Sequence, residues 1–409
     1  MKLGKIIAVA FAICISQVTW TWLFADSSAV PLDHFYKMQT APGWNTTPKS
    51  SQLTNGYARF NNWDSLRFFE IAENGYHAPA DRAPRWEDIP DYANNFTTPP
   101  AYPLFTRVIH HVLGIDTDVS LLIAAELSCV VLWIYLILLL QSSGLREREI
   151  QWAAFLIAIY PSAFYLVCGY SESLFIASTL GLFYWTNRWL KESKVQFWWI
   201  ALLHGMIATA TRTAGLPVIV YPLIAALAVN PKVWKQGALL SAATALGFGS
   251  FLIFSAYRFG RWDLYFQIAH ISGEKPDPFA IFKVFNFIPR FFFETTVVSI
   301  NRGLTLLMVV AGGVAFYQDR GRKKRAALYS VIAGFLFTTV SSRTDAQFDS
   351  MIRYTLPIQF VLVLAIAEAY KERDIQFKKR PRLFTTLILL SIALQGWSAW
   401  RFLHGKWVS

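Results

Sequence analysis

The sequence has little charge and little cysteine. Only 16% of its 409 residues are charged, whereas soluble domains usually carry about 25%. Hydrophobic residues make up 54% of the chain and aromatic residues 16%. One or two soluble cores cannot bury that much apolar surface, so the composition excludes a disordered chain and a secreted soluble enzyme. It predicts a membrane protein built from repeated apolar segments.

The cysteines and the missing motifs narrow the class further. Cys14, Cys129 and Cys168 each lie within an apolar run, without the paired spacing of a disulfide scaffold or a zinc site. We therefore expect them to be small buried hydrophobic residues. The sequence also has no Walker P-loop, no Rossmann fingerprint and no HExxH motif.

The first apolar run, Ile6 to Phe24, has two interpretations. It follows Lys2 and Lys5, and small residues near Ala25 could form the cleavage site of a signal peptide. The run is longer than the usual apolar region of a signal peptide. We therefore expect a retained first transmembrane helix over residues 6–24.

A long polar stretch and further apolar segments follow. Residues 25–118 are rich in Asn, Thr, Pro and Trp, and are the only section long enough for an extramembrane lobe. The later segments complete an all-α bundle of about eleven transmembrane helices within residues 119–402, in a single domain that spans residues 1–409. They cover approximately 119–140, 151–168, 172–187, 196–213, 215–230, 237–257, 295–317, 326–341, 354–370 and 383–402.

The net charge of +12 gives this bundle an orientation. With eleven crossings, the N-terminus and the short connectors all fall on one side, and together they carry the whole excess of positive charge. Membrane proteins keep such connectors in the cytoplasm. The charge therefore orients the chain and does not indicate a nucleic-acid partner. The connectors are Arg146 to Arg148, Arg188 to Lys194, Lys232 to Lys235, Arg320 to Arg325 and Lys371 to Arg382.

The first candidate for chemistry is Asp64, in the exterior stretch Asn61 to Tyr76. Apolar residues there recur at helical spacing and Gly75 suits a helix end, so we predict a short amphipathic helix at the membrane surface. A second amphipathic stretch runs from Pro99 to His111. An ionised Asp64 in the first turn could take a proton from an attacking hydroxyl. A purely capping role is the other interpretation.

The second candidate is the junction at Tyr170, Ser171 and Glu172, where two apolar segments meet with almost no connector. Ser171 and Glu172 suit a helix start, and capping explains them well. The same side chains would face the exterior, where a carboxylate could bind sugar hydroxyls or a divalent cation. The spacing leaves both interpretations open.

Two arginines lie at exterior segment ends. Arg212 ends an apolar run, where an arginine is costly unless it is paired or hydrated. Its side chain could reach the interface or bind phosphate. Arg353, followed by Tyr354 and Pro357, opens a segment at the level of lipid headgroups and suits a lipid phosphate.

Several motifs resemble one family in their order along the chain. They are Trp63-Asp64 with Ile71 to Tyr76, then Tyr102 to Phe105, then Tyr160 to Ser162 and Ser171 to Phe175. Together they resemble the PIG-V mannosyltransferases, which add the second mannose of glycosylphosphatidylinositol anchors and have bacterial relatives. The wider class is the GT-C glycosyltransferases, integral-membrane enzymes that use polyprenyl-phosphate sugars. The resemblance covers roughly residues 60–215; beyond it only Arg353, Tyr354 and Pro357 match.

The resemblance implies roles for these residues. Asp64 matches the catalytic base of the first exterior loop, and Glu172 with Ser171 and Tyr170 lines the cavity. Arg353, with Tyr354, would lie near the donor phosphate, and Trp63 would contact substrate beside Asp64. We expect the donor phosphate near Arg353 or Arg212. The chain is short for a eukaryotic member and its first loop departs from the usual spacing. This favours a bacterial relative with another acceptor.

The resulting hypothesis is an inverting mannosyltransferase. It takes a sugar from a polyprenyl or dolichyl phosphate and gives it to a glycolipid or other exterior acceptor. The active side is the exterior face of a bacterial plasma membrane, or the lumen of the endoplasmic reticulum in a eukaryote. The sequence assigns no cofactor, and the two carboxylates leave a divalent cation open. A lipid or solute transporter or flippase is the alternative, and a non-catalytic scaffold is a third interpretation.

Overall fold

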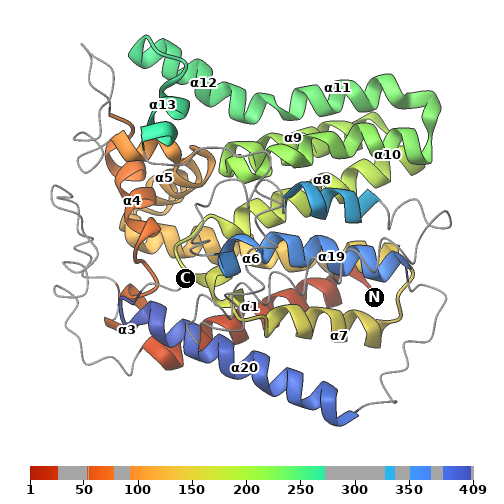
Figure 1. Ribbon diagram of the computed structural model, residues 1–409, viewed down its shortest axis with the longest axis horizontal. Helices are drawn as coiled ribbons and strands as arrows, with labels where there is room; N and C mark the ends of the chain where they lie inside the picture. Colours follow the sequence, from red (N-terminus) through yellow and green to blue (C-terminus); the bar gives the residue numbers. More distant parts are fainter. Residues whose placement is uncertain are drawn as a thin grey trace, which may run out of the picture.

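The apolar segments form long helices whose axes lie roughly parallel to one another (Figure 1). The computed structural model describes residues 1–25, 53, 55–77, 93–271, 328–336, 351–369 and 381–406, and no strand occurs among them. The fold of this part of the chain is therefore all-helical, as expected. The expected segment 295–317 lies outside the described residues, as do residues 26–52, 54 and 78–92 of the expected exterior loop 25–118.

The helices follow the apolar pattern closely, with short 3-10 turns between several of them. Residues 328–336 are also helical. The elements are α1 (Leu3–Ala25), α3 (Asn55–Ala58), α4 (Asp64–Asn74), η2 (Ala93–Thr97), α5 (Ala101–Leu113), α6 (Thr117–Ser142), α7 (Glu147–Ala158), η3 (Ala163–Val167), α8 (Glu172–Glu192), α9 (Val195–Thr211), η4 (Thr213–Val220), α10 (Tyr221–Val229), η5 (Pro231–Val233), α11 (Trp234–Thr244), α12 (Leu246–Phe259), α13 (Leu264–Ile271), α18 (Met351–Tyr354), α19 (Leu356–Ala369) and α20 (Pro381–Leu403).

Within the described residues, 4 helices are long and apolar enough to cross a membrane: Leu3–Ala25, Thr117–Ser142, Pro231–Phe259 and Thr385–Leu403. The distribution of polar and apolar side chains on α1 is the reverse of that on a helix of a soluble protein. Its small and polar residues Cys14, Gln17 and Thr21 are buried, while Phe11 and Ile15 are exposed. An apolar outer face with a polar inner one suits a lipid environment.

Two expected boundaries are wrong. The segment 151–168 is not one helix, because α7 ends at Ala158 and the chain turns before η3. Pro161 explains this end, since proline lacks a backbone N–H and disfavours helical geometry in the residue before it. The segment 172–187 continues as α8 to Glu192, so the connector to α9 is only Ser193 and Lys194.

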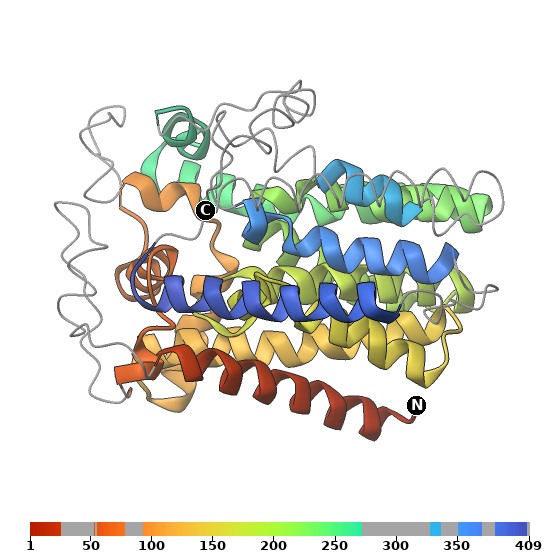
Figure 2. The same cartoon turned by 60° about the horizontal axis from the view of Figure 1, so that its bottom comes forward.

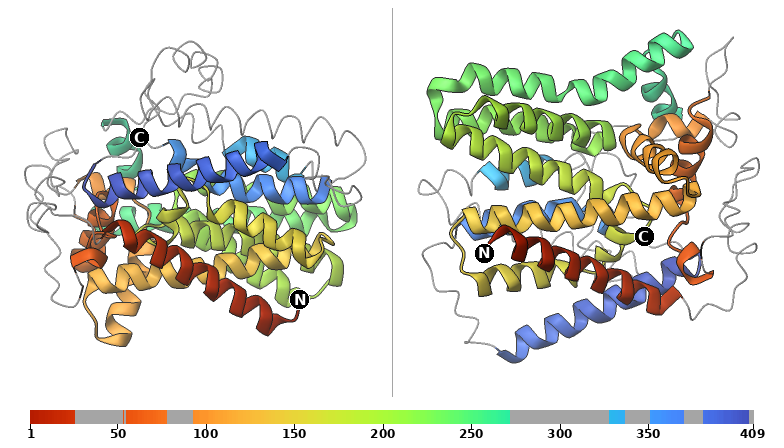
Figure 3. Two further views of the ribbon diagram at one scale, coloured as in Figure 1. Left: turned by 90° about the horizontal axis from the view of Figure 1, so that it is seen from below. Right: turned by 180° about the vertical axis from the view of Figure 1, so that it is seen from behind.

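The two ends of the bundle differ in content. The N-terminus lies at the end away from α4 and α5, and α1 and α20 lie side by side (Figures 1 and 3). Near the N-terminus, Lys5 forms an ion pair with Glu147, and Gln141 donates a hydrogen bond to the carbonyl of Met1 at 3.3 Å. The basic connector after α6 therefore lies beside the N-terminus, in agreement with the charge pattern. The end that carries α4, α5 and α13 is opposite (Figure 2).

The described part of the first exterior loop is folded onto the bundle. Both expected amphipathic helices form, as α4 and α5, and they pack against each other and against α6. In α5, Tyr102 and Thr106 are fully buried whereas Val108 and Val112 are more than half exposed. An aromatic cluster of Tyr76, Phe96, Phe248 and Phe251 joins this loop to α12 and α13.

Candidate functional site

The turn between α7 and α8 carries the first part of the site. Residues 161–173 are buried, although their backbone is largely irregular. In a membrane protein, irregular backbone is stable only when other protein groups enclose it. The turn ends at Ser171, the N-cap of α8, and Glu172 begins the helix. Ser171 makes no side-chain capping hydrogen bond, so the capping interpretation of this residue is wrong.

Asp64 comes from α4, on the other side of the site. Asp64 occupies the first turn and Gly75 ends the helix with φ +80°, both as the sequence predicted. The residue before it, Trp63, has φ 50°, a left-handed conformation that a bulky side chain rarely adopts. Such backbone strain is typical of functional sites. No side-chain cap forms at this helix start, so Asp64 is not a capping residue.

Arg353 brings these two segments together. Its Nη2 lies 2.7 Å from Oδ2 of Asp64, and its Nε lies 3.3 Å from Oε1 of Glu172. The Arg353 side chain is 3% exposed and that of Glu172 is 1% exposed. Two carboxylates that are 108 positions apart thus share one buried guanidinium. Sequence spacing gave no sign of this pairing.

Arg212 completes a chain of four alternating charges. Its Nη1 lies 2.5 Å from the same Oε1 of Glu172, and it also donates to the Ser171 hydroxyl at 3.4 Å. The order is therefore Asp64, Arg353, Glu172, Arg212. Arg212 points into the bundle and does not extend to the surface, since its side chain is 14% exposed. Arg212 is thus paired, as an arginine at the end of an apolar run requires, and its expected roles at the interface or on a phosphate both stay predictions.

The charges around Asp64 keep its carboxylate ionised. Burial opposes ionisation, but the positive charge of Arg353, with smaller contributions from Arg67 and Arg212, outweighs it. These neighbours hold the pKa of Asp64 below its usual range. The side chain remains 26% exposed, so a second molecule can reach it from outside.

Tyrosine rings surround the Arg353 guanidinium. Its central carbon atom, Cζ, lies 4.7 Å from the ring centre of Tyr354, 5.2 Å from that of Tyr170 and 5.7 Å from that of Tyr165. Tyr354 also accepts a hydrogen bond from Arg353 Nη2 at 2.9 Å. Electron-rich ring faces hold a cation by electrostatic attraction. Tyr165 was not singled out from the sequence, although it lies close to Tyr170 along the chain.

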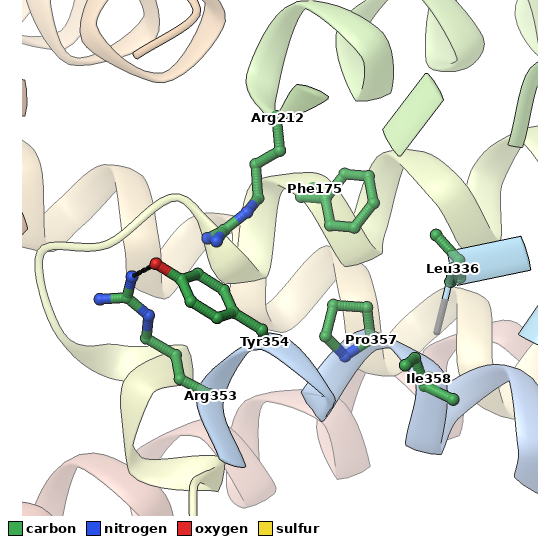
Figure 4. A pocket seen from close by; sticks show the side chains of 7 residues that line it. All are labelled: Phe175, Arg212, Leu336, Arg353, Tyr354, Pro357 and Ile358. Carbon is green, nitrogen blue, oxygen red and sulfur yellow. Dashed lines mark hydrogen bonds between the residues drawn. The ribbon is translucent and has the colours of Figure 1, made fainter. Parts of the chain in front are cut away.

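A small, partly open pocket lies beside these residues, and its space of about 280 Å³ includes volume that is open to solvent (Figure 4). One end has Arg212, Arg353 and the Tyr354 hydroxyl. The other is apolar and is formed by side chains from α8, residues 328–336 and α19, which the sequence did not identify apart from Pro357. The lining residues at that end are Phe175, Leu336, Pro357 and Ile358. The pocket thus joins two cations to an apolar slot.

A second set of contacts fixes the backbone that carries Asp64. Asn61 Nδ2 donates to the carbonyl of Asp118 at 2.8 Å, and Asn62 Nδ2 donates to that of Phe402 at 2.6 Å. The Gly169 N–H donates to the carbonyl of Phe60 at 3.2 Å, and the Tyr170 hydroxyl to that of Asn62 at 3.0 Å. The segment before Asp64 is therefore tied to α6, to α20 and to the buried turn.

Arg107 fixes the far end of α4. From α5 it donates to the carbonyls of Ala72 at 2.6 Å and Ile71 at 3.1 Å. The last carbonyls of a helix lack an intrahelical donor, and the guanidinium supplies one to Ala72; the Ile71 carbonyl also accepts from the Gly75 N–H at 3.0 Å. Arg107, Asn61 and Asn62 were missed at the sequence level, and only their place in a motif-rich loop could have suggested them.

The site around Asp64 and Glu172 offers few side chains that could bind a metal ion. No group of three or more His, Cys, Asp or Glu side chains lies close enough to hold one in the part of the chain that the structure describes. The two carboxylates of the site are bound to guanidinium groups. The stretch with Asp345 and Asp349 lies outside the described residues. A divalent cation thus gains no support from the geometry of Asp64 and Glu172.

Neither the known protein-family models nor the curated proteins contain a match to this chain.

Proposed function

We propose that the protein is a membrane glycosyltransferase that moves a hexose, with mannose as the expected sugar, from a polyprenyl-phosphate donor to an exterior acceptor hydroxyl. The observation that carries the proposal is the pocket. It places two arginines at one end, apolar side chains at the other, and an ionised aspartate within 2.7 Å of one arginine. The arginines match a lipid phosphate, and the apolar side chains match an isoprenoid tail. Asp64 beside them can accept the proton of the acceptor hydroxyl.

Each end of the pocket suits one part of the donor. Arg212 and Arg353 provide planar, permanently charged groups that bind phosphate well. Phe175, Leu336 and Pro357 provide an apolar path for the first units of an isoprenoid chain. The absence of a nucleotide-binding motif in the sequence agrees with a donor that arrives through the bilayer.

The reaction is a single displacement. Asp64 accepts the proton of the acceptor hydroxyl, whose oxygen forms a bond to the anomeric carbon. The bond from that carbon to the phosphate oxygen breaks, and polyprenyl phosphate leaves with the electron pair. Arg353 and Arg212 offset the charge that collects on the leaving phosphate. Attack opposite the leaving group inverts the anomeric centre.

We propose the larger architecture on the same basis. A bundle of about eleven membrane helices of the GT-C type would place the site on the exterior side, opposite the basic connectors. The chain would then be a relative of the PIG-V mannosyltransferases, and its glycolipid acceptor would approach the exposed side of Asp64. A transporter needs access from both sides, whereas Asp64, Glu172 and Arg353 form one buried network that includes the start of α4, a helix at the end of the bundle away from the N-terminus (Figure 1).

The test is transfer from a labelled polyprenyl-phosphate mannose by the purified full-length protein. We expect release of polyprenyl phosphate, and a loss of about 10²- to 10⁴-fold in rate for Asp64→Asn because a proton acceptor is removed. Glu70→Gln, on the same helix but outside the site, is the matched control and should keep the wild-type rate. Full activity of a folded Asp64→Asn protein would refute the assigned base. Lipid translocation without release of polyprenyl phosphate would favour the transporter.

A further inference from the structure

Glu172 is unlike the other groups of the site because its partners are the same two arginines that the pocket offers to a ligand. Its Oε1 lies 2.5 Å from Arg212 Nη1 and 3.3 Å from Arg353 Nε. The carboxylate is 1% exposed, so it holds these guanidiniums within the protein and away from water. An incoming anion must compete with it.

The second oxygen of this carboxylate is poorly accommodated. Oε2 is buried and has no hydrogen-bond partner. A buried oxygen without a partner carries most of its desolvation cost, and the cost is larger for a charged group. Glu172 therefore binds the arginines with one oxygen only, whereas a phosphate could offer an oxygen to each of them.

The charge balance leads to the same conclusion. Asp64 and Glu172 carry two negative charges, and Arg353 and Arg212 carry two positive charges. The four-residue chain is neutral in itself, so its two arginines are already balanced by its two carboxylates, and Arg67 beside Asp64 adds a positive charge outside the chain of pairs. A phosphate gains full use of the guanidiniums only when a carboxylate withdraws.

We propose that Glu172 is an internal stand-in for the ligand's phosphate: it occupies Arg212 and Arg353 in the free protein and is displaced when a phosphate-bearing lipid binds. This inference rests on the proposed function for the nature of the ligand. It assigns Glu172 a role other than contact with the sugar. After displacement the carboxylate remains in the first turn of α8, where the helix dipole stabilises negative charge.

The stand-in also links ligand binding to Asp64. Arg353 contacts Asp64 and Glu172 at once, so a phosphate that draws Arg353 toward itself weakens its pair with Asp64. The aspartate then becomes a better proton acceptor only when the donor is in place. Water near an empty site therefore meets a base that is still paired with arginine.

The experiment measures binding of farnesyl phosphate, a short isoprenyl phosphate, to the full-length protein in detergent by calorimetry. Farnesol, which lacks the phosphate, is the ligand control. We expect Glu172→Gln to bind farnesyl phosphate at least about tenfold more tightly than the wild type, because a neutral amide competes less well for the arginines. Affinity for farnesol should stay unchanged.

Glu368→Gln is the matched protein control. Glu368 is also a buried glutamate, 8% exposed, and it accepts a hydrogen bond from Ser143 at 2.7 Å near the opposite end of the bundle. The same substitution there should leave the affinity for farnesyl phosphate unchanged. If Glu172→Gln fails to fold, Glu172→Asp keeps the charge but shortens its reach, and a severalfold gain in affinity is expected.

The outcomes separate this inference from the proposed function. Binding by the wild type with equal or weaker binding by Glu172→Gln and Glu172→Asp would overturn the stand-in and leave the lipid-phosphate site intact. Binding by Glu172→Gln alone would support both. If neither the wild type nor the variants bind farnesyl phosphate, the lipid-phosphate site itself falls, and the stand-in with it.

Discussion

The two ends of the helix bundle use ion pairs in different ways. At the end that carries the N-terminus, Lys5 pairs with Glu147 and Arg188 with Glu192, and these side chains are between 25% and 55% exposed. At the other end Arg353 and Glu172 are 3% and 1% exposed. Exposed pairs contribute little to stability, whereas a buried charge depends strongly on its partner.

The difference in exposure indicates which role each end of the bundle suits. Exposed basic residues can be exchanged or rearranged at little cost, which suits a role in setting membrane orientation. Buried alternating charges are expensive to assemble and persist only if every member is matched. The costly arrangement lies beside the pocket, at the end where we propose the chemistry, and the exposed pairs lie at the end where we expect the basic connectors to set the orientation.

The largest effect on stability should follow Arg353→Met. This change leaves Asp64 and Glu172 without their shared cation, and removing one partner of a buried pair costs about 3–5 kcal/mol. Thermal melting followed by tryptophan fluorescence would measure the loss. Combining Arg353→Met with Asp64→Asn should restore part of it, because one unpaired carboxylate is removed. A melting point for Arg353→Met equal to the wild type would break the contrast between the two ends.

A smaller effect is expected for Gly169→Ala. A Cβ at this position would lie 2.0 Å from Asn61 Oδ1, so the Asn61 side chain must move and release its bond to Asp118. Overpacking of this kind costs about 1–3 kcal/mol and would shift the backbone that carries Asp64. Both the melting point and farnesyl phosphate binding should fall.

Gly249→Ala is the control for that change. A Cβ on Gly249 meets nothing within 4 Å, and alanine favours the helix in which it lies. We expect equal or slightly higher stability. Equal losses from Gly169→Ala and Gly249→Ala would show that the close approach at Gly169 does not matter.

The smallest effect belongs to Lys5→Ala at the opposite end. Its pair with Glu147 is exposed to solvent on both sides, at 55% and 42%. The melting point should not change measurably, at low or at high salt. A drop as large as that of Arg353→Met would mean that exposure does not distinguish the two ends.

Local patterns in the sequence predicted the helices and the immediate setting of Asp64. The spacing of apolar residues gave α4, and Gly75 marked its end, because both depend on neighbours within a few positions. The end of α7 was missed since Pro161 lies inside an otherwise continuous apolar run. Capping by Ser171 was a sound local expectation, but Arg212, 41 positions away, binds that hydroxyl instead.

The pairing within the site was beyond local reasoning. Asp64, Glu172, Arg212 and Arg353 were each selected one by one, but their alternating order depends on how α4, α8, α9 and α18 pack. The apolar end of the pocket was missed for a similar reason. Phe175 and Ile358 are ordinary hydrophobic residues in the sequence, and only their common orientation makes them a slot.

The contact between α1 and α20 has a consequence for how the chain is made. α1 is synthesised long before α20, against which it packs, and Asn62 donates its hydrogen bond to Phe402 near the end of α20. Arg353, the shared cation, is also synthesised long after Asp64 and Glu172. The two carboxylates are therefore synthesised without their partner, and the site closes only after α18 has been made. A chain that stops before Arg353 lacks the shared cation and carries an unfinished site.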